Sequence, residues 1–206
     1  MSAGRLERDG YYEVPAGKIA AVVTSLEMHE PPAAEAPPAP EGVALVRVMA
    51  PDVDWYLSLF RAIGTPWLWF SRLRLGRNEL SAILADPRIE VWAVRHRATD
   101  IGLVELDFRD SPHVELSFFG FRPEWTGRGL GRFAMAHAIS RAFGNGGRRL
   151  WVHTCTLDHP AALRFYLRCG FRAFARSVEI ADDPRLTGLL PRDAAPDVPL
   201  VDGVGR

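Results

Sequence analysis

Residues 125–139 read WTGRGLGRFAMAHAI, in which three glycines stand at every second position before a helical pattern. A glycine inside a regular element costs about 0.5–1 kcal/mol relative to alanine, so this stretch needs a compensating role. Glycines allow backbone N–H groups to converge, and they allow a bulky anion to approach without meeting a Cβ atom. At the start of a helix these donors add to the positive end of the helix dipole, which makes phosphate the natural ligand. Arg128 and Arg132 add positive charge beside the loop.

Three alternatives compete with this interpretation: a turn needed only for tight packing, a nucleoside triphosphate site and a dinucleotide site. A triphosphate loop requires Lys and Ser or Thr after its last glycine, but Arg and Phe follow Gly131. The dinucleotide pattern G-x-G-x-x-A is present at 129–134, and Asp158 follows the next strand. Residues 123–125, however, separate the glycines from the preceding strand, whereas the dinucleotide turn is tight. The dinucleotide site therefore matches better than the triphosphate site, but the separation of its glycines from the strand opposes it.

The order of the other elements predicts a mixed sheet. Short, turn-rich links join three strand-like runs at 89–96, 101–108 and 113–121. These strands must pair antiparallel, because a parallel return needs a crossover of a dozen residues or more. We also expect strands at 43–49, 148–157 and 172–180, and helices at 53–63, 78–84, 160–169 and from the glycine loop to about Phe143. The predicted fold class is α/β (α+β), a mixed and mostly antiparallel central sheet with helices packed on it.

Composition narrows the class of protein. The chain has 206 residues, of which 48% are hydrophobic and 24% charged, enough to bury one core. Lys and Arg total 25, as do Asp and Glu, so no net field attracts nucleic acid or an anionic membrane. The N-terminus lacks the apolar stretch of a secretory signal, and Cys155 and Cys169 make a poor disulfide framework. We therefore expect a cytoplasmic protein that binds neither nucleic acid nor a membrane.

The chain divides into three parts. Residues 1–42 contain a strand-like segment at Lys18–Met28 and then a Pro/Ala-rich linker at 30–42. Residues 43–180 have the composition of a compact domain, and residues 181–206 return to Pro and Asp, as in a tail laid over the surface. We expect the N-terminal strand to pair at a sheet edge, in its own domain or in a second copy. The sequence is thus compatible with a homodimer.

Two segments in the predicted domain resemble one known family. The stretches RPEWTGRGLG and HPAALRFYLRCGF are similar to motifs of the GNAT superfamily of acetyl-CoA-dependent N-acetyltransferases. The cofactor loop of that family follows Arg/Gln-x-x-Gly-x-Gly/Ala, matched here at 126–131, with Thr126 in place of the usual Arg or Gln. The later motif is matched by His159, in place of the usual Asn, and by Ala162, Tyr166, Gly170 and Phe171. Two motifs in the expected order are more specific than either alone.

The resemblance implies where acetyl-CoA binds. In this family the strand before the loop splays from its neighbour at a bulge, and the pantetheine amides bond to its backbone like an added strand. Here that strand is 113–121, with Gly120 as the expected bulge residue. The expected cofactor-binding residues are Phe119, Gly120, Phe121, Thr126, Gly127, Arg128, Gly129, Leu130, Gly131, Arg132, His159 and Ala162. Ordinary sheet core is the alternative for the two phenylalanines.

The resemblance also implies two catalytic residues. Acetyl transfer to an amine needs a neutral amine, alignment, a polarised carbonyl and a proton for the leaving thiolate. Tyr166 stands where the family has its general acid, and Glu115 is the candidate base, eleven positions before the loop motif. Period-two alternation would place Glu115 on one strand face with Ser117, Phe119 and Phe121. A tyrosine packed on the sheet and a solvent-facing glutamate are the alternatives, and His153 is a weaker proton relay.

The acceptor is less defined by the sequence. Six aromatic residues occur where the family walls its acceptor site: Trp55, Tyr56, Phe60, Trp67, Trp69 and Phe70. They can form an apolar or aromatic amine pocket, but the interpretation we favour is helix core with a dimer or linker contact. No Cys/His/Asp cluster has metal-ligand spacing, so we expect no metal. We expect transfer of an acetyl group from acetyl-CoA to a primary amine of a small molecule or peptide by direct attack on the thioester. The alternative is a non-catalytic acyl-CoA-binding sensor on the same fold.

Overall fold

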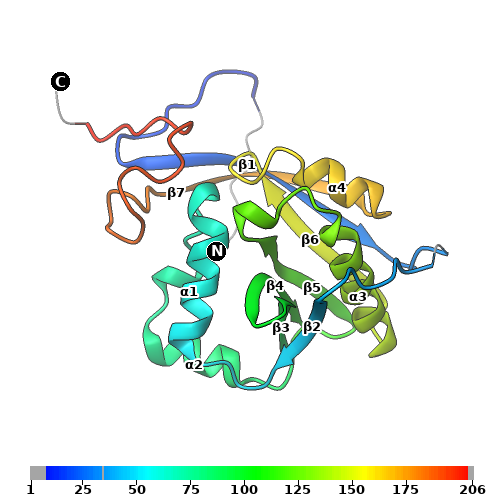
Figure 1. The fold of residues 1–206 in the computed structure, drawn as a ribbon. Coiled ribbons are helices and arrows are strands. Elements are labelled where there is room, and N and C mark those ends of the chain that lie inside the picture. The colour runs from blue at the N-terminus through cyan, green and yellow to red at the C-terminus, as the bar shows by residue number, and fades with distance from the viewer. Residues whose placement is uncertain (1–7, 34, 204–206) are drawn as a thin grey trace.

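The computed structural model describes residues 8–33 and 35–203, and a seven-stranded sheet forms its centre (Figure 1). Residues 1–7, Ala34 and 204–206, parts of the expected N-terminal segment, linker and tail, lie outside the described residues. The strands are β1 (Lys18–Met28), β2 (Val43–Val48), β3 (Ile89–His96), β4 (Thr99–Asp107), β5 (His113–Phe121), β6 (Arg149–Cys155) and β7 (Arg172–Asp182). The helices are α1 (Val53–Gly64), α2 (Arg77–Ala85), α3 (Leu130–Gly144) and α4 (Ala162–Arg168).

The strand order is β2-β3-β4-β5-β6-β1-β7, and β5 and β6 pair in parallel. The other neighbours pair antiparallel, including the predicted meander of β3, β4 and β5. The mixed, mostly antiparallel sheet expected from the sequence is therefore confirmed. Asp52 caps the start of α1, because its carboxylate accepts hydrogen bonds from the N–H groups of Asp54 and Trp55 at 2.9 and 3.0 Å.

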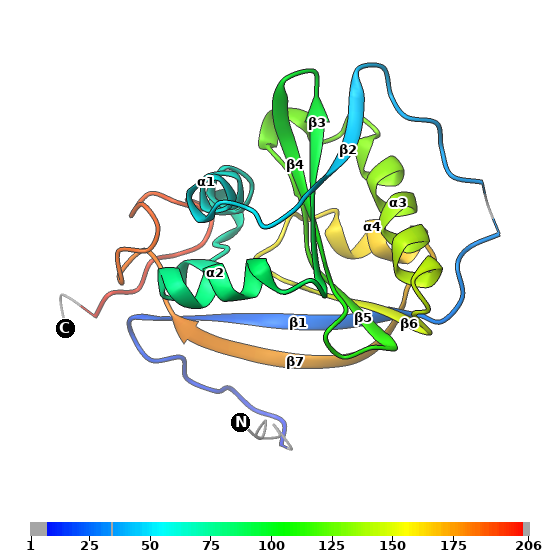
Figure 2. The same cartoon turned by 90° about the horizontal axis from the view of Figure 1, so that it is seen from below.

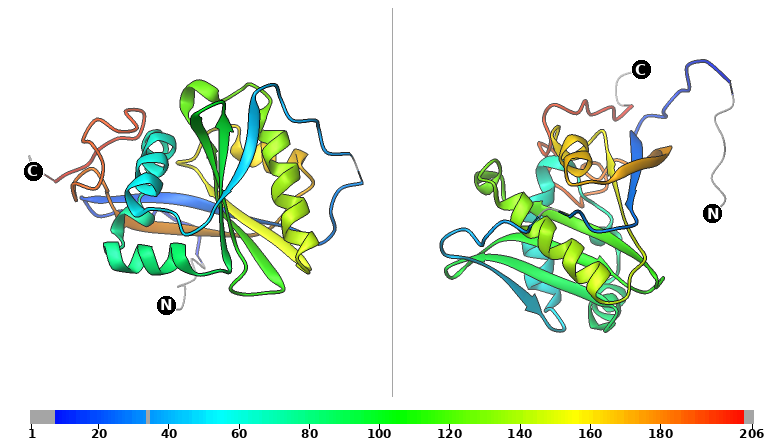
Figure 3. Two further views of the ribbon diagram at one scale, coloured as in Figure 1. Left: turned by 60° about the horizontal axis from the view of Figure 1, so that its bottom comes forward. Right: turned by 90° about the vertical axis from the view of Figure 1, so that its right-hand side faces the viewer.

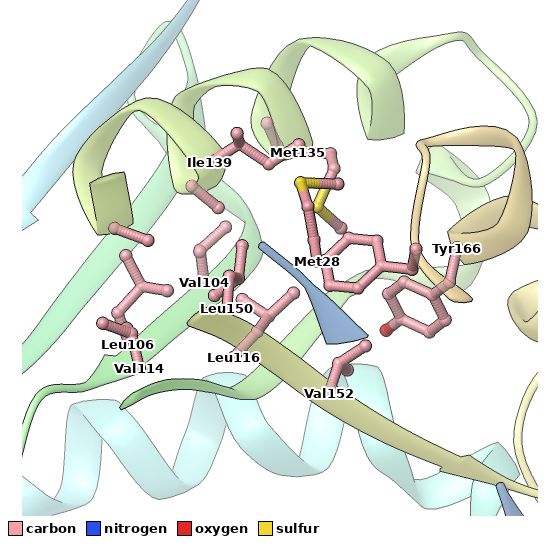
Figure 4. Packing of buried hydrophobic residues seen from close by; sticks show 14 of the residues in the cluster. Met28, Val104, Leu106, Val114, Leu116, Met135, Ile139, Leu150, Val152 and Tyr166 are labelled. Atoms are coloured by element: carbon pink, nitrogen blue, oxygen red, sulfur yellow. The ribbon is translucent and has the colours of Figure 1, made fainter. Parts of the chain in front are cut away.

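Helices cover both faces of the sheet (Figures 2 and 3). Helices α3 and α4 pack on one face, where the core contains Met135 and Ile139 of α3 together with Val104 and Leu116 of the sheet (Figure 4). Helices α1 and α2 pack on the other face with a second core around Phe60. None of the helices in the described ranges is long and apolar enough to cross a membrane.

Strand β1 lies between β6 and β7, so the expectation that it pairs at a sheet edge is wrong. It is antiparallel to both neighbours, which makes β6 and β7 parallel to each other with one strand position between them. The crossover through α4 leaves that position open, and β1 fills it from the start of the chain. Leu26 and Met28 are consequently buried, with 0% and 4% of their surface exposed.

The C-terminal tail packs more deeply than a surface tail would. Leu190, Ala194 and Ala195 belong to the core on the α1 and α2 face. Asp183 and Arg185 form an ion pair at 2.7 Å, and each side chain is only 2% exposed. Arg185 also donates to the backbone carbonyl of Val198 at 2.8 Å, so the tail folds back around one buried guanidinium.

Candidate active site

A cleft of about 870 Å³ opens where β5 and β6 part. The two strands pair only over 113–115 and 149–151 in the described structure, and no pairing joins them beyond Glu115 and Trp151. The glycine loop, α3 and α4 line one side of the cleft, and residues 67–71 between α1 and α2 line the other. The splayed strand pair expected from the sequence is present.

The three glycines of the loop have two different roles. Gly127 and Gly129 have φ angles of +78° and +81°, a region that other residues rarely adopt. A Cβ atom added at either position would meet nothing within 4 Å, so the space beside the backbone is open. Gly131 is different, because a Cβ atom there would lie 3.1 Å from the ring of Phe165. The first two glycines therefore shape an open loop, and the third allows α3 to pack against α4.

The start of α3 carries backbone donors that no side chain caps. Gly129 is the N-cap residue and makes no side-chain hydrogen bond to the helix. The N–H groups of the first helical turn, beginning at Leu130, therefore point toward the loop without an intrahelical partner. Leu130, Gly131 and Arg132 all line the cleft. This end of the cleft is suited to an anion.

The other expected loop residues are placed differently. The guanidinium of Arg128 lies 4.9 Å from the centre of the Trp125 ring, and Arg128 does not line the cleft. Thr126 lines it, and its hydroxyl lies 3.5 Å from the carbonyl of Arg122. Positive charge on the cleft wall comes instead from Arg132 and from Arg168 of α4.

Strand β5 contains a bulge, but it lies at Ser117 rather than at Gly120. Consecutive residues of β4 pair with Leu116 and Phe118, so Ser117 is the extra residue between them. Gly120 instead pairs in regular register with Leu103.

Close packing explains why residue 120 is a glycine. An added Cβ atom would lie 2.6 Å from Ile63 Cγ2 and 3.1 Å from the Trp69 ring. Gly120 therefore allows α1 and the following segment to approach the sheet beside the cleft.

The bulge changes which side chains share the face of Glu115. Without it, alternation would group Glu115 with Phe119 and Phe121, but the extra residue groups it with Phe118. Phe118 packs on the α1 and α2 side, whereas Phe119 and Phe121 pack with α3 and α4. The expectation that Glu115 shares a face with Phe119 and Phe121 is therefore wrong.

Glu115 itself lies beside the cleft rather than in its wall. It lines a smaller hollow of about 350 Å³ together with Asp107, Arg109 and Trp151. Its Oε1 atom is 3.6 Å from Nδ1 of His153, and His153 does line the cleft. Glu115 thus reaches the cleft through the imidazole of His153.

Tyr166 of α4 lies on the α3 and α4 side of the gap. Its ring packs against Phe165 and Phe171 at centroid distances of 5.6 and 5.9 Å, and Figure 4 shows it at one end of the buried cluster, near Val152. Tyr166 lines the cleft, and no residue in the described ranges makes a hydrogen bond to its hydroxyl. Burial, with smaller effects of Asp158 and Cys169, raises the pKa of Tyr166, so the phenol keeps its proton at neutral pH.

His159 and Ala162 lie at the start of α4. Nδ1 of His159 accepts a hydrogen bond from the Ala161 N–H at 3.1 Å, and its ring meets Trp67 edge-on at a centroid distance of 5.0 Å. His159 therefore stabilises the turn into α4 and contacts the opposite wall of the cleft. Ala162 and Phe165 add apolar surface on the same side.

Only some of the predicted aromatic segment reaches the cleft. Trp67, Trp69 and Phe70 line it, whereas Tyr56 and Phe60 are fully buried in the core. Part of the segment therefore forms the cleft wall opposite α3 and α4, and part of it belongs to the core.

Two carboxylates of the cleft were not predicted as site residues. Asp158 accepts hydrogen bonds from the Trp69 indole at 3.1 Å and from the Thr154 hydroxyl at 2.8 Å, which ties the two walls together. Asp158 stands in the sequence between β6 and His159, and this position is the signal from which its place in the cleft could be predicted. Glu179 of β7 also lines the cleft, although β1 separates β7 from β6. No group of His, Cys, Asp and Glu in the described ranges is arranged to hold a metal ion.

The sequence model of the Acetyltransferase (GNAT) family matches residues 55–171, more than half of the chain. The chain therefore belongs to the GNAT acetyltransferase family. A comparison with curated proteins finds no match.

Solved structures share the fold. A GCN5-related N-acetyltransferase from Sphaerobacter thermophilus is 17% identical with a TM-score of 0.58, over 82% of this chain and 53% of that one. A GCN5-related N-acetyltransferase from Kribbella flavida is 19% identical with a TM-score of 0.55, over 84% and 63%. An aminoglycoside acetyltransferase from an uncultured soil metagenomic sample, in complex with sisomicin, is 14% identical with a TM-score of 0.52, over 62% and 87%. The chain spans less than two thirds of the first two proteins, and at these identities the likeness concerns the fold alone.

Proposed function

We propose that the protein is an N-acetyltransferase that moves an acetyl group from acetyl-CoA to a primary amine of a small molecule or peptide. One observation carries this proposal. A single cleft passes through the gap between β5 and β6 and connects the uncapped start of α3 to the aromatic wall on the opposite face. Two substrates can therefore meet end to end inside the sheet.

The cofactor half of the cleft fits acetyl-CoA. The pyrophosphate would bind the backbone N–H groups of the loop and the first turn of α3, next to Arg132. The pantetheine arm would bind along Phe119, Gly120 and Phe121, where no pairing between β5 and β6 occurs among the described residues. His159 and Ala162 would border the arm from α4.

The acceptor half fits an amine carried on an apolar or aromatic body. Trp67, Trp69 and Phe70 supply flat apolar surface. Glu179 stands two residues before Ala181 of β7, which packs in the core of the α1 and α2 face, so strand alternation places its negative charge on this side. Arg132 and Arg168 belong to α3 and α4. An amine that arrives as an ammonium ion is attracted to the Glu179 end.

Transfer would proceed by direct attack of the amine on the thioester. Alignment of the two substrates supplies much of the rate, and backbone N–H groups of the splayed strand polarise the carbonyl. Tyr166 would donate a proton to the departing sulfur, since its phenol is protonated and borders the cleft.

A thiol-release assay tests the proposal. The purified protein is incubated with acetyl-CoA and, separately, with 2-phenylethylamine, spermidine, sisomicin, free amino acids and lysine-containing peptides. Release above the rate without amine, with the N-acetyl product found by mass spectrometry, is the expected result for at least one amine. Tight acetyl-CoA binding without release for any of these amines would contradict the proposal and favour an acyl-CoA sensor.

A further inference from the structure

His153 occupies a place in the cleft that neither Glu115 nor Tyr166 reaches. It lies two residues beyond Trp151, the last residue of β6 that pairs with β5, and its side chain is 50% exposed in the cleft. The alternate residue Val152 packs in the core with α3 and α4, so His153 projects from the other face of β6. Tyr166 belongs to the α3 and α4 core. An acid and a base are thus available on opposite faces of the sheet at one gap.

Three carboxylates surround His153. Glu115 of β5 is 3.6 Å from its Nδ1 atom, and Asp158 and Glu179 line the same cleft from the loop before α4 and from β7. The Asp158 carboxylate already accepts three hydrogen bonds, whereas no hydrogen bond or ion pair to Glu179 occurs in the described part of the chain. Glu115, with smaller contributions from Asp158 and Glu179, raises the pKa of His153 against the opposing effect of burial.

We propose that His153 is the general base of the acetyl transfer and that Glu115 is the residue that positions its imidazole. The inference rests on the proposed function. Because Glu115 faces Nδ1, the Nε2 atom of the ring is left to receive the proton of the amine. Glu115 then acts through the imidazole rather than on the substrate.

The proton balance of the step follows from this placement. The amine nitrogen bonds to the thioester carbonyl carbon, and the carbon–sulfur bond breaks with its electron pair on sulfur. His153 takes one proton from the nitrogen, and Tyr166 gives one proton to the sulfur. Both side chains then return to their starting protonation by exchange with water. One amide and one thiol form for each amine and thioester consumed.

Kinetics of matched variants test the base role. We would measure kcat/KM against pH for the wild type, His153→Gln and Glu115→Gln, with acetyl-CoA and whichever panel amine turns over fastest. The wild-type rate should rise with pH through the His153 pKa, because only the neutral imidazole accepts a proton. His153→Gln should lower kcat/KM about 100- to 10,000-fold and abolish that rise. His29→Gln, an exposed histidine outside the cleft, should behave as the wild type.

Glu115→Gln should give a different result. Loss of the carboxylate lowers the pKa of His153, so the rise in kcat/KM should move to lower pH. Side-chain NMR titration of the histidines reads the same change without any amine substrate. Melting temperature and acetyl-CoA affinity, measured for each variant, separate a lost base from a lost fold.

Each outcome has a defined consequence. A His153→Gln variant with wild-type kcat/KM and pH profile would overturn the base role, and with it the positioning role of Glu115, but not the proposed function. An unchanged His153 pKa in Glu115→Gln would overturn the positioning role. A wild-type protein that binds acetyl-CoA but acetylates none of the amines would overturn the proposed function, and the base role with it.

Discussion

Tyr166 is a buried residue that also lines the cleft. The ring is held by Phe165 and Phe171, so removal of the oxygen alone leaves the packing of α4 in place. Because burial raises the pKa of the phenol, the group keeps its proton at neutral pH. Its proposed role can therefore be tested without disturbing the fold.

We predict that Tyr166→Phe slows acetyl transfer about 100- to 10,000-fold, the usual range for a lost general acid. The loss should appear in kcat more than in KM, because the proton is needed as the thiolate leaves. Isothermal titration should give a nearly unchanged Kd for acetyl-CoA. Normal turnover with a verified amine would make Tyr166 a packing residue only.

Gly129 in the loop and Gly144 at the end of α3 differ in the effect that an added side chain would have. At Gly129 the space is open, but the φ angle of +81° strains any other residue, and a side chain would occupy the approach to the start of α3. At Gly144, the last residue of α3, the space is also open and the backbone is helical. These two positions form a matched pair at the two ends of one helix.

We predict that Gly129→Val abolishes measurable binding of acetyl-CoA, whereas Gly144→Ala leaves the Kd unchanged and stabilises α3 by up to about 1 kcal/mol. The first change obstructs the anion site, and the second removes only backbone freedom. Calorimetry with acetyl-CoA and thermal melting check both. Equal affinity for acetyl-CoA in the two variants would disprove the anion site at the start of α3.

At the scale of elements, local signals predicted the parts of the fold that depend on local chemistry. The meander of β3, β4 and β5 follows from the short links between these strands. The bulge at Ser117 has no such signal, because it depends on register with β4. The placing of Glu115 depends on that bulge. The glycine loop and Tyr166 were identifiable because their motifs are contiguous, whereas Glu179 reaches the cleft only through the position of β7.

The position of β1 is likewise a long-range property. Nothing within Lys18–Met28 indicates two neighbours rather than one, since both cases require alternating strand residues. The second neighbour exists because the crossover between β6 and β7 skips one position. β1 is therefore an interior strand of the sheet that contains the cleft and does not merely cover its edge.

Leu26 of β1 tests this placement. It is fully buried, so we predict that Leu26→Ala lowers the free energy of unfolding by about 2–5 kcal/mol. Val178→Ala, at a 45% exposed site on the neighbouring strand, should change it by less than about 0.5 kcal/mol. Urea denaturation followed by tryptophan fluorescence gives both values. Similar small losses for the two variants would mean that β1 is weakly held at an edge.

At the scale of the whole molecule, the two faces of the sheet have different partners. The α3 and α4 face carries the glycine loop and Tyr166. Its core is closed by α3, which directly follows the loop in the sequence, and by α4, which contains Tyr166. The α1 and α2 face is closed partly by the tail beyond β7, through Leu190, Ala194 and Ala195. The aromatic wall of the cleft belongs to this second face. The α1 and α2 face of the sheet therefore depends on a segment from the end of the chain.

Arg185 is the residue on which that dependence can be measured. Arg185 forms a buried ion pair with Asp183 and donates to a carbonyl of the tail. Removal of the guanidinium would leave the buried carboxylate of Asp183 without a compensating charge. We predict that Arg185→Ala lowers the free energy of unfolding by about 3–5 kcal/mol. Arg192→Ala breaks an exposed ion pair of the same tail, with Asp202, and should cost less than about 1 kcal/mol. Equal urea midpoints for the two variants would show that the tail rests on the α1 face without stabilising it.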